Sequence, residues 1–127
     1  MSISTHIDTA RKVITSIAFG ILTDSDLLEA RRQMIADPDF HPSFDRIWDC
    51  SEVTQVELDD NVLAPLIATS LSEDSIFRAI VCRSVAPMAH VLDFIAQARR
   101  HHRPVAVFPT RADAERWIEL QHANQPE

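Results

Sequence analysis

Two cysteines stand where an α/β protein often carries chemistry. Cys50 and Cys82 each close an apolar run, "FDRIWDC" and "IFRAIVC", that is typical of a buried strand. Active sites of α/β proteins commonly form at strand ends, and a thiol activated by a histidine and a carboxylate is a nucleophile. No GxSxG or HExxH motif accompanies them. We interpret both as packed, reduced thiols and predict no catalytic residue; an enzyme that uses Cys50 or Cys82 is the alternative.

Charged residues form two further candidate sites. Glu57, Asp59 and Asp60 would have to be buried to act as an acid–base pair, so we interpret them as a polar loop that leads to a helix N-cap. The basic run Arg99, Arg100 and Arg103 predicts a solvated helix end, with an acidic ligand or partner as the alternative.

The composition argues against several functions. The formal net charge of −7 disfavours nucleic acid and anionic membranes as partners. A single glycine argues against phosphate-binding loops, and none of the six histidines falls in a metal-binding motif. We therefore predict no cofactor and no metal. Without a signal peptide or a long apolar stretch, the chain is expected to be cytoplasmic, with no membrane span.

Alternating patterns predict the elements that would position these residues. Strands are expected at 3–8, 12–21, 44–50, 76–82 and 104–108. Helices are expected after Thr23 and Thr110 as N-caps, around 62–71, and from Pro87 toward Arg99. The segment 51–60 is expected to be a loop. Leu27, Leu28, Met34 and Ile35 are expected to share the buried face of the first helix.

This order predicts an α/β fold in a single domain that covers residues 1–127. The short link between the first two strands implies an antiparallel hairpin, and the later helical crossovers imply parallel pairing. The result is a mixed sheet of about five strands with about four helices. Trp48 and Trp117 fall within apolar patterns and are expected in the core rather than around a ligand.

The segment "DCSEVTQVELDDNVLAPL" resembles the strand, loop and helix of anti-sigma-factor antagonist (STAS, or SpoIIAA-like) domains. Asp49, Ser51, Val53 and Thr54 match the start of that pattern. The stretches "GILTDSDLLEARRQMIADPDFHPSFDRIWDCSEV", "FRAIVC" and "VAVFPTRADAERWIEL" are similar to the bacterial SpoIIAA-like branch of unknown function. The family's "DSSG" phospho-acceptor turn reads "LDDNV" here, without serine or glycine.

The resemblance implies a non-enzymatic regulatory domain that binds a protein partner. Its expected partner surface is Asp49, Ser51, Thr54, Asp59 and Asp60 with the helix that follows. SpoIIAA-like domains are also structurally similar to the lipid-carrying CRAL-TRIO class, which implies the alternative of a module that binds a small apolar ligand or lipid. A homodimer is a further expectation, because two-fold dimers are common.

Overall fold

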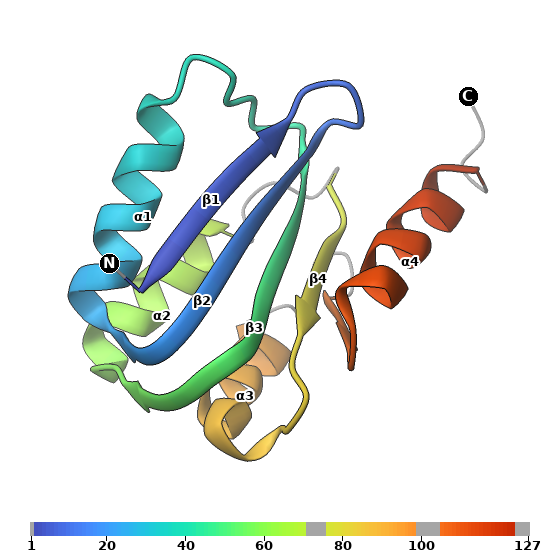
Figure 1. The fold of residues 1–127 in the computed structure, drawn as a ribbon. Coiled ribbons are helices and arrows are strands. Elements are labelled where there is room, and N and C mark those ends of the chain that lie inside the picture. Colours follow the sequence, from blue (N-terminus) through green and yellow to red (C-terminus); the bar gives the residue numbers. More distant parts are fainter. Residues whose placement is uncertain (1, 71–75, 99–104, 124–127) are drawn as a thin grey trace.

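A computed structural model describes residues 2–70, 76–98 and 105–123 of the chain (Figure 1). The elements follow in the order β1 (Ile3–Asp8), β2 (Val13–Thr23), α1 (Asp24–Ala36), β3 (Asp45–Glu57), α2 (Asp60–Ser70), β4 (Arg78–Val81), a 3-10 turn (Ala86–Met88), α3 (Ala89–Ala98), β5 (Val105–Phe108) and α4 (Arg111–Ala123). The predicted α/β class and the five-stranded mixed sheet with four helices are confirmed.

The sheet has the strand order β1-β2-β3-β4-β5, with β1 antiparallel to β2 and the other neighbours parallel. From β2 onward each crossover moves one strand in the same direction. Because such crossovers are right-handed, α1, α2 and α3 lie on one face of the sheet. Helix α4 follows the last strand and covers the opposite face at β4 and β5 (Figure 1).

The predicted hairpin and the predicted starts of two helices are confirmed. The β1–β2 link is closed by the Arg11 N–H, which donates to Asp8 Oδ1 at 2.9 Å. Thr23 caps α1, since its Oγ1 accepts a hydrogen bond from the Asp26 N–H at 3.3 Å. Thr110 Oγ1 likewise accepts from the Asp113 N–H at 3.2 Å at the start of α4. The only glycine, Gly20, has φ +71° beside an irregularity in the β2–β3 pairing.

The predicted loop at 51–60 is wrong, because β3 continues to Glu57. Its first half, Arg46–Asp49, pairs with both β2 and β4, whereas residues 52–57 pair with β2. Glu52, Thr54 and Gln55 are accordingly exposed. Polar residues are tolerated in this part of β3, because it forms an edge of the sheet. Its polar residues give it the composition of a loop.

The helices also differ from the expectation in detail. Leu28 and Ile35 of α1 are 47% and 50% exposed, so the apolar face of α1 is limited to the half-buried Leu27, Ala30 and Met34. Pro65 lies inside α2, one turn after its start at Asp60. No helix in the described part of the chain is both long and apolar enough to cross a bilayer.

Each face of the sheet has its own core. Leu63, Met88 and Val91 pack with Ala18 and Cys50 on the face that carries α1, α2 and α3. On the other face Ala114 and Ile118 of α4 pack against Ile47, Phe77 and Val81. Helix α4 is also held at its end, where His122 Nε2 is hydrogen-bonded to Oδ2 of the buried Asp45.

Candidate ligand-binding site

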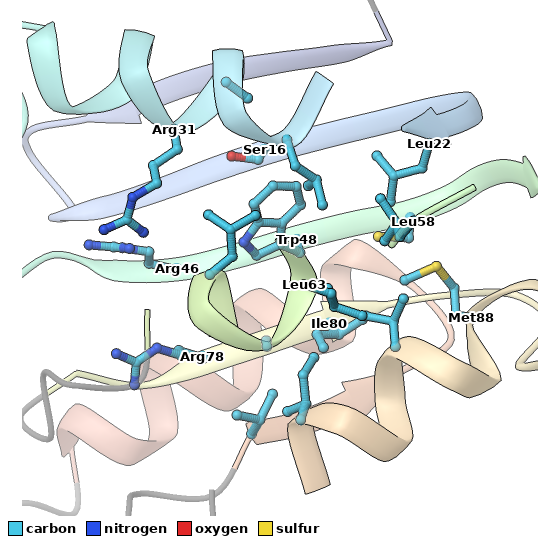
Figure 2. Close-up of a pocket in the computed structure, with 18 of the residues that line it drawn as sticks. Ser16, Leu22, Arg31, Arg46, Trp48, Leu58, Leu63, Arg78, Ile80 and Met88 are labelled. Atoms are coloured by element: carbon cyan, nitrogen blue, oxygen red, sulfur yellow. The ribbon is translucent and has the colours of Figure 1, made fainter. Parts of the chain in front are cut away.

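A cavity of about 140 Å³ lies between the sheet and helices α1, α2 and α3 (Figure 2). The space is partly open to solvent and is not a sealed void. Its walls are mainly apolar and come from four strands and the three helices: Ile14, Leu22, Leu27, Ala30, Met34, Trp48, Cys50, Leu58, Leu63, Leu66, Ala79, Ile80, Met88, Val91, Ile95 and Val105.

The register of the sheet sets the floor of the cavity. Ser16 of β2, Trp48 of β3 and Ile80 of β4 are successive cross-strand neighbours on this face. Trp48 was expected to be a core residue, and it does pack against the core while also lining the cavity. The Ser16 hydroxyl is buried and lies 3.3 Å from Thr5 Oγ1. The floor is thus apolar with one polar group in it.

Three arginines lie at one end of the cavity, and Leu22, Leu58 and Met88 lie at the other (Figure 2). Arg46 and Arg78 are direct cross-strand neighbours in the row below Trp48 and Ile80. Arg31 reaches the same end from α1. Arg78 is only 8% exposed, and Arg31 and Arg46 are half-buried. All three also interact with other residues of the chain.

This basic cluster was missed by sequence reasoning. The run Arg99, Arg100 and Arg103 was the only positive cluster seen along the chain, and it lies outside the described residues. Arg31, Arg46 and Arg78 are distant in sequence, so only the fold brings them together. The available signal was an arginine at an inward-facing position within each apolar run, "FDRIWDC" and "IFRAIVC".

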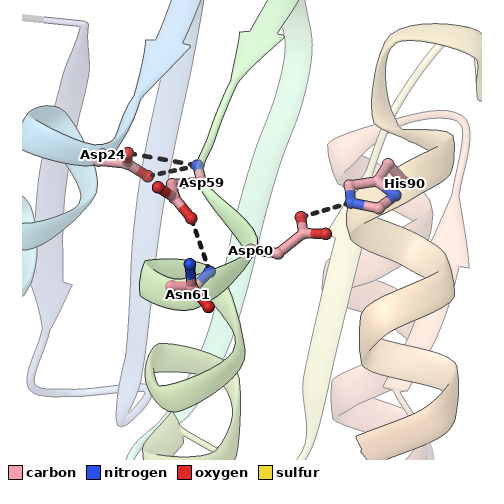
Figure 3. Close-up of polar contacts among 5 residues, drawn as sticks. All are labelled: Asp24, Asp59, Asp60, Asn61 and His90. Atoms are coloured by element: carbon pink, nitrogen blue, oxygen red, sulfur yellow. Dashed lines mark hydrogen bonds and ion pairs between the residues drawn. The ribbon is translucent and has the colours of Figure 1, made fainter.

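The predicted acidic residues Asp59 and Asp60 lie at the opposite end of the strands, at the start of α2 (Figure 3). The Asp59 N–H donates to Asp24 Oδ1 at 3.1 Å, and Asp59 Oδ1 accepts from the Asn61 N–H at 2.8 Å. Asp60 Oδ1 lies 2.7 Å from His90 Nε2 at the start of α3. Both aspartates are exposed, so they cap and join helix ends in solvent, as the interpretation of an N-cap predicted.

Asp49 and Ser51 form a separate group on β3. Asp49 is 7% exposed, and its Oδ1 accepts from the Ser51 hydroxyl at 2.6 Å and the Ser51 N–H at 3.1 Å. Its Oδ2 is 3.8 Å from Arg111 Nε of α4. Thr54 is exposed further along the strand. The five residues of the predicted partner surface therefore divide between a buried strand position, the strand's polar half and the start of α2.

Both cysteines are free and buried on the cavity side of the sheet. Burial, together with the neighbouring Cys82 and Asp49, raises the pKa of Cys50 to about 12. Burial also raises the pKa of Cys82. Because a nucleophilic cysteine needs its thiolate, these environments are unfavourable for covalent catalysis at neutral pH.

No protein-family model matches this chain, and no curated protein matches it significantly. Membership of the SpoIIAA-like family and the regulatory protein interaction that it implies therefore stay predictions. Among residues 2–70, 76–98 and 105–123, no group of three or more histidine, cysteine, aspartate or glutamate side chains is arranged to hold a metal ion. The cavity is the feature with the most specific geometry.

Proposed function

We propose that this domain is a non-enzymatic binding module for a small molecule with an apolar body, held in the cavity between the sheet and α1, α2 and α3. The observation that carries the proposal is the 140 Å³ space with its apolar walls. Small-molecule sites are typically concave and mostly apolar, with a few polar groups that fix orientation. Ser16 and the arginines supply such groups here.

The energetics of the cavity support a ligand. The walls of the space expose mainly apolar surface. A molecule that fills the space would gain dispersion contacts with these walls and remove their apolar surface from water.

The volume limits the size of the ligand. An apolar cavity of about 150 Å³ holds a benzene molecule. The space of about 140 Å³ therefore suits an apolar body of roughly six carbon atoms rather than a long acyl chain. Of the two ligand classes in the original alternative, the dimensions favour a small ligand over a lipid.

The test fills the cavity with a side chain. Ala30 is half-buried on α1 and lines the cavity, so Ala30→Leu should occupy the space while keeping a good helix former. We expect the free energy of unfolding of this variant to lie within about 1 kcal/mol of that of the parent protein. The variant should also lose benzene binding, as measured by NMR titration of the full chain.

The matched control is Ala36→Leu, which makes the same change at an exposed position of α1. It should bind benzene as the parent does. If the parent does not bind benzene, or if Ala30→Leu binds it unchanged in a folded state, the proposed function is wrong.

A further inference from the structure

We infer that the ligand is a small neutral carbonyl compound, whose oxygen accepts hydrogen bonds from Trp48 and Ser16 and whose apolar body fills the rest of the cavity. This inference rests on the proposed function and adds the chemical class of the ligand. It starts from the floor of the cavity, where these two residues are direct cross-strand neighbours on β3 and β2.

The indole of Trp48 brings a hydrogen-bond donor to the cavity. Its N–H donates and cannot accept, so it needs a partner with lone pairs. Trp48 is half-buried, and among residues 2–70, 76–98 and 105–123 no protein group accepts a hydrogen bond from this N–H. Buried tryptophans usually have such a partner. A ligand atom with lone pairs would supply it.

Ser16 brings a second donor to the same place. Its side chain is buried, and its Oγ lies 3.3 Å from Thr5 Oγ1, a contact in which either hydroxyl can donate. When Thr5 donates, the hydrogen of the Ser16 hydroxyl is left for a ligand. Paired strands lie about 4.8 Å apart, so neighbouring side chains on one face can reach a single atom. A carbonyl oxygen has two lone pairs and can accept from both.

The surroundings of these donors favour a neutral ligand with an apolar body. Figure 2 shows Trp48 between the arginine end of the cavity and the end formed by Leu22, Leu58 and Met88. Both donors are neutral, and a neutral carbonyl group is much less costly to bury among apolar walls than a charge. The volume of about 140 Å³ suits a body of about six carbon atoms, as in cyclohexanone.

The donors should distinguish a carbonyl compound from a hydrocarbon of the same shape. Solvent can reach the partly open cavity when it holds no ligand. A hydrocarbon that displaces this solvent leaves the donors without an acceptor, which is unfavourable, whereas a ketone replaces the lost hydrogen bonds. Hydrocarbons also leave water more readily than ketones do, so the experiment has to cancel that difference.

The first experiment therefore compares affinity ratios between variants. Cyclohexanone and methylenecyclohexane, and cyclopentanone and methylenecyclopentane, differ only by an oxygen in place of a CH₂ group. They would be titrated into the full chain by NMR. Trp48→Phe keeps an aromatic ring without the N–H, and we expect it to lower the ratio of ketone to alkene affinity by about fivefold. Ser16→Ala should lower the ratio in the same direction.

The control changes the third residue of the floor. Ile80→Val alters the apolar wall beside Trp48 and removes no polar group. It should change the affinities for ketone and alkene alike and leave their ratio as in the parent. A ratio that falls as far in Ile80→Val as in Trp48→Phe would contradict the role of the donors.

The indole N–H signals test the inference in the parent protein, independently of whether a variant folds. The chain has two tryptophans, and Trp117 packs against Phe77 and Phe108 on the α4 face. Trp117→Phe assigns the two signals. Cyclohexanone should shift the Trp48 signal downfield by much more than methylenecyclohexane does, and neither should shift that of Trp117.

The outcomes separate the two proposals. If ketone and alkene both bind but move the Trp48 signal equally, or if their ratio is unchanged in a folded Trp48→Phe variant, the carbonyl inference is wrong and the cavity remains a binding site. Binding of neither member of either pair would overturn both proposals.

Discussion

The two faces of this sheet are packed in different ways. On the α4 face, Phe77 meets Trp117 edge-on with ring centres 5.7 Å apart, and Phe108 lies 5.6 Å from the same indole. Ala114 and Ile118 complete a close-packed layer there. On the other face helices α1, α2 and α3 pack on the sheet and leave a space of about 140 Å³.

The difference shows that the cavity is not imposed by the strands themselves. Residues 47 and 48 are neighbours on β3, yet Ile47 is fully packed beneath α4 while Trp48 borders the cavity. On the α4 face Trp117 packs against Phe77 and Phe108, whereas the described cavity residues of the helices opposite are aliphatic side chains, Arg31 and the small Ala30. The side chains of Arg46 and Arg78 likewise lie on the cavity face of the sheet. A closed core and a binding site thus share one sheet.

The largest effect should come from opening a void on the packed face. Ile118→Ala removes a side chain that is 3% exposed, and it should lower the free energy of unfolding by about 2–5 kcal/mol. Leu120→Ala on the same helix removes a side chain that is 51% exposed and should change stability by about 0.5 kcal/mol or less. Urea denaturation measures both, and equal losses would break the contrast between a packed and an open face.

The thiols on the cavity face should make stability fall at alkaline pH. Burial raises the pKa of Cys50 to about 12 in the folded state, so the folded protein holds this proton where the unfolded chain releases it. The contribution is complete below the ordinary thiol pKa and is lost as pH rises toward 12. Between pH 9 and 11 the free energy of unfolding should therefore fall by about 1.4 kcal/mol per pH unit through Cys50.

The chain is well suited to this measurement, because it contains no tyrosine and a single lysine. Denaturation at several pH values would give the slope, and Cys50→Ala should reduce it. An unchanged slope in this variant would mean that Cys50 is not the group responsible.

The smallest effect concerns the helix that forms one wall of the cavity. Thr23→Ala removes the hydroxyl that caps α1 and should lower stability by about 1 kcal/mol. Ser25→Ala, at an exposed site in the first turn, should have little effect. Amide hydrogen exchange should accelerate in α1 more than in α4. Equal acceleration in both helices would argue that the two faces do not unfold independently.

Most of the fold could be predicted because its signals are local. Thr23 and Thr110 predict the starts of two helices because threonine is a favourable N-cap, and the apolar runs predict the strands. The second half of β3 could not be predicted in this way, since Glu52, Thr54 and Gln55 border the sheet and need no apolar character. The burial predicted for Leu28 and Ile35 is wrong for the opposite reason. Both are apolar but exposed, because periodicity does not reveal how much of a helix its neighbours cover.

The candidate site depends on contacts that no local pattern contains. Cap residues such as Asp59 could be placed from sequence, because their partners lie within a few positions. Arg31, Arg46 and Arg78 come together only because the fold places α1 over the strands β3 and β4. The cavity also depends on how the side chains pack in three dimensions, which the amino-acid composition does not reveal.

The central claim is that a small molecule enters the cavity face and leaves the α4 face unchanged. Isoleucine methyl groups report on both faces, since Ile14 and Ile80 line the cavity while Ile47 and Ile118 pack together between the sheet and α4. With benzene added to methyl-labelled protein, the account predicts concentration-dependent NMR shifts at Ile14 and Ile80 and little change at Ile47 and Ile118. Unshifted cavity methyls, or equal shifts on both faces, would contradict it.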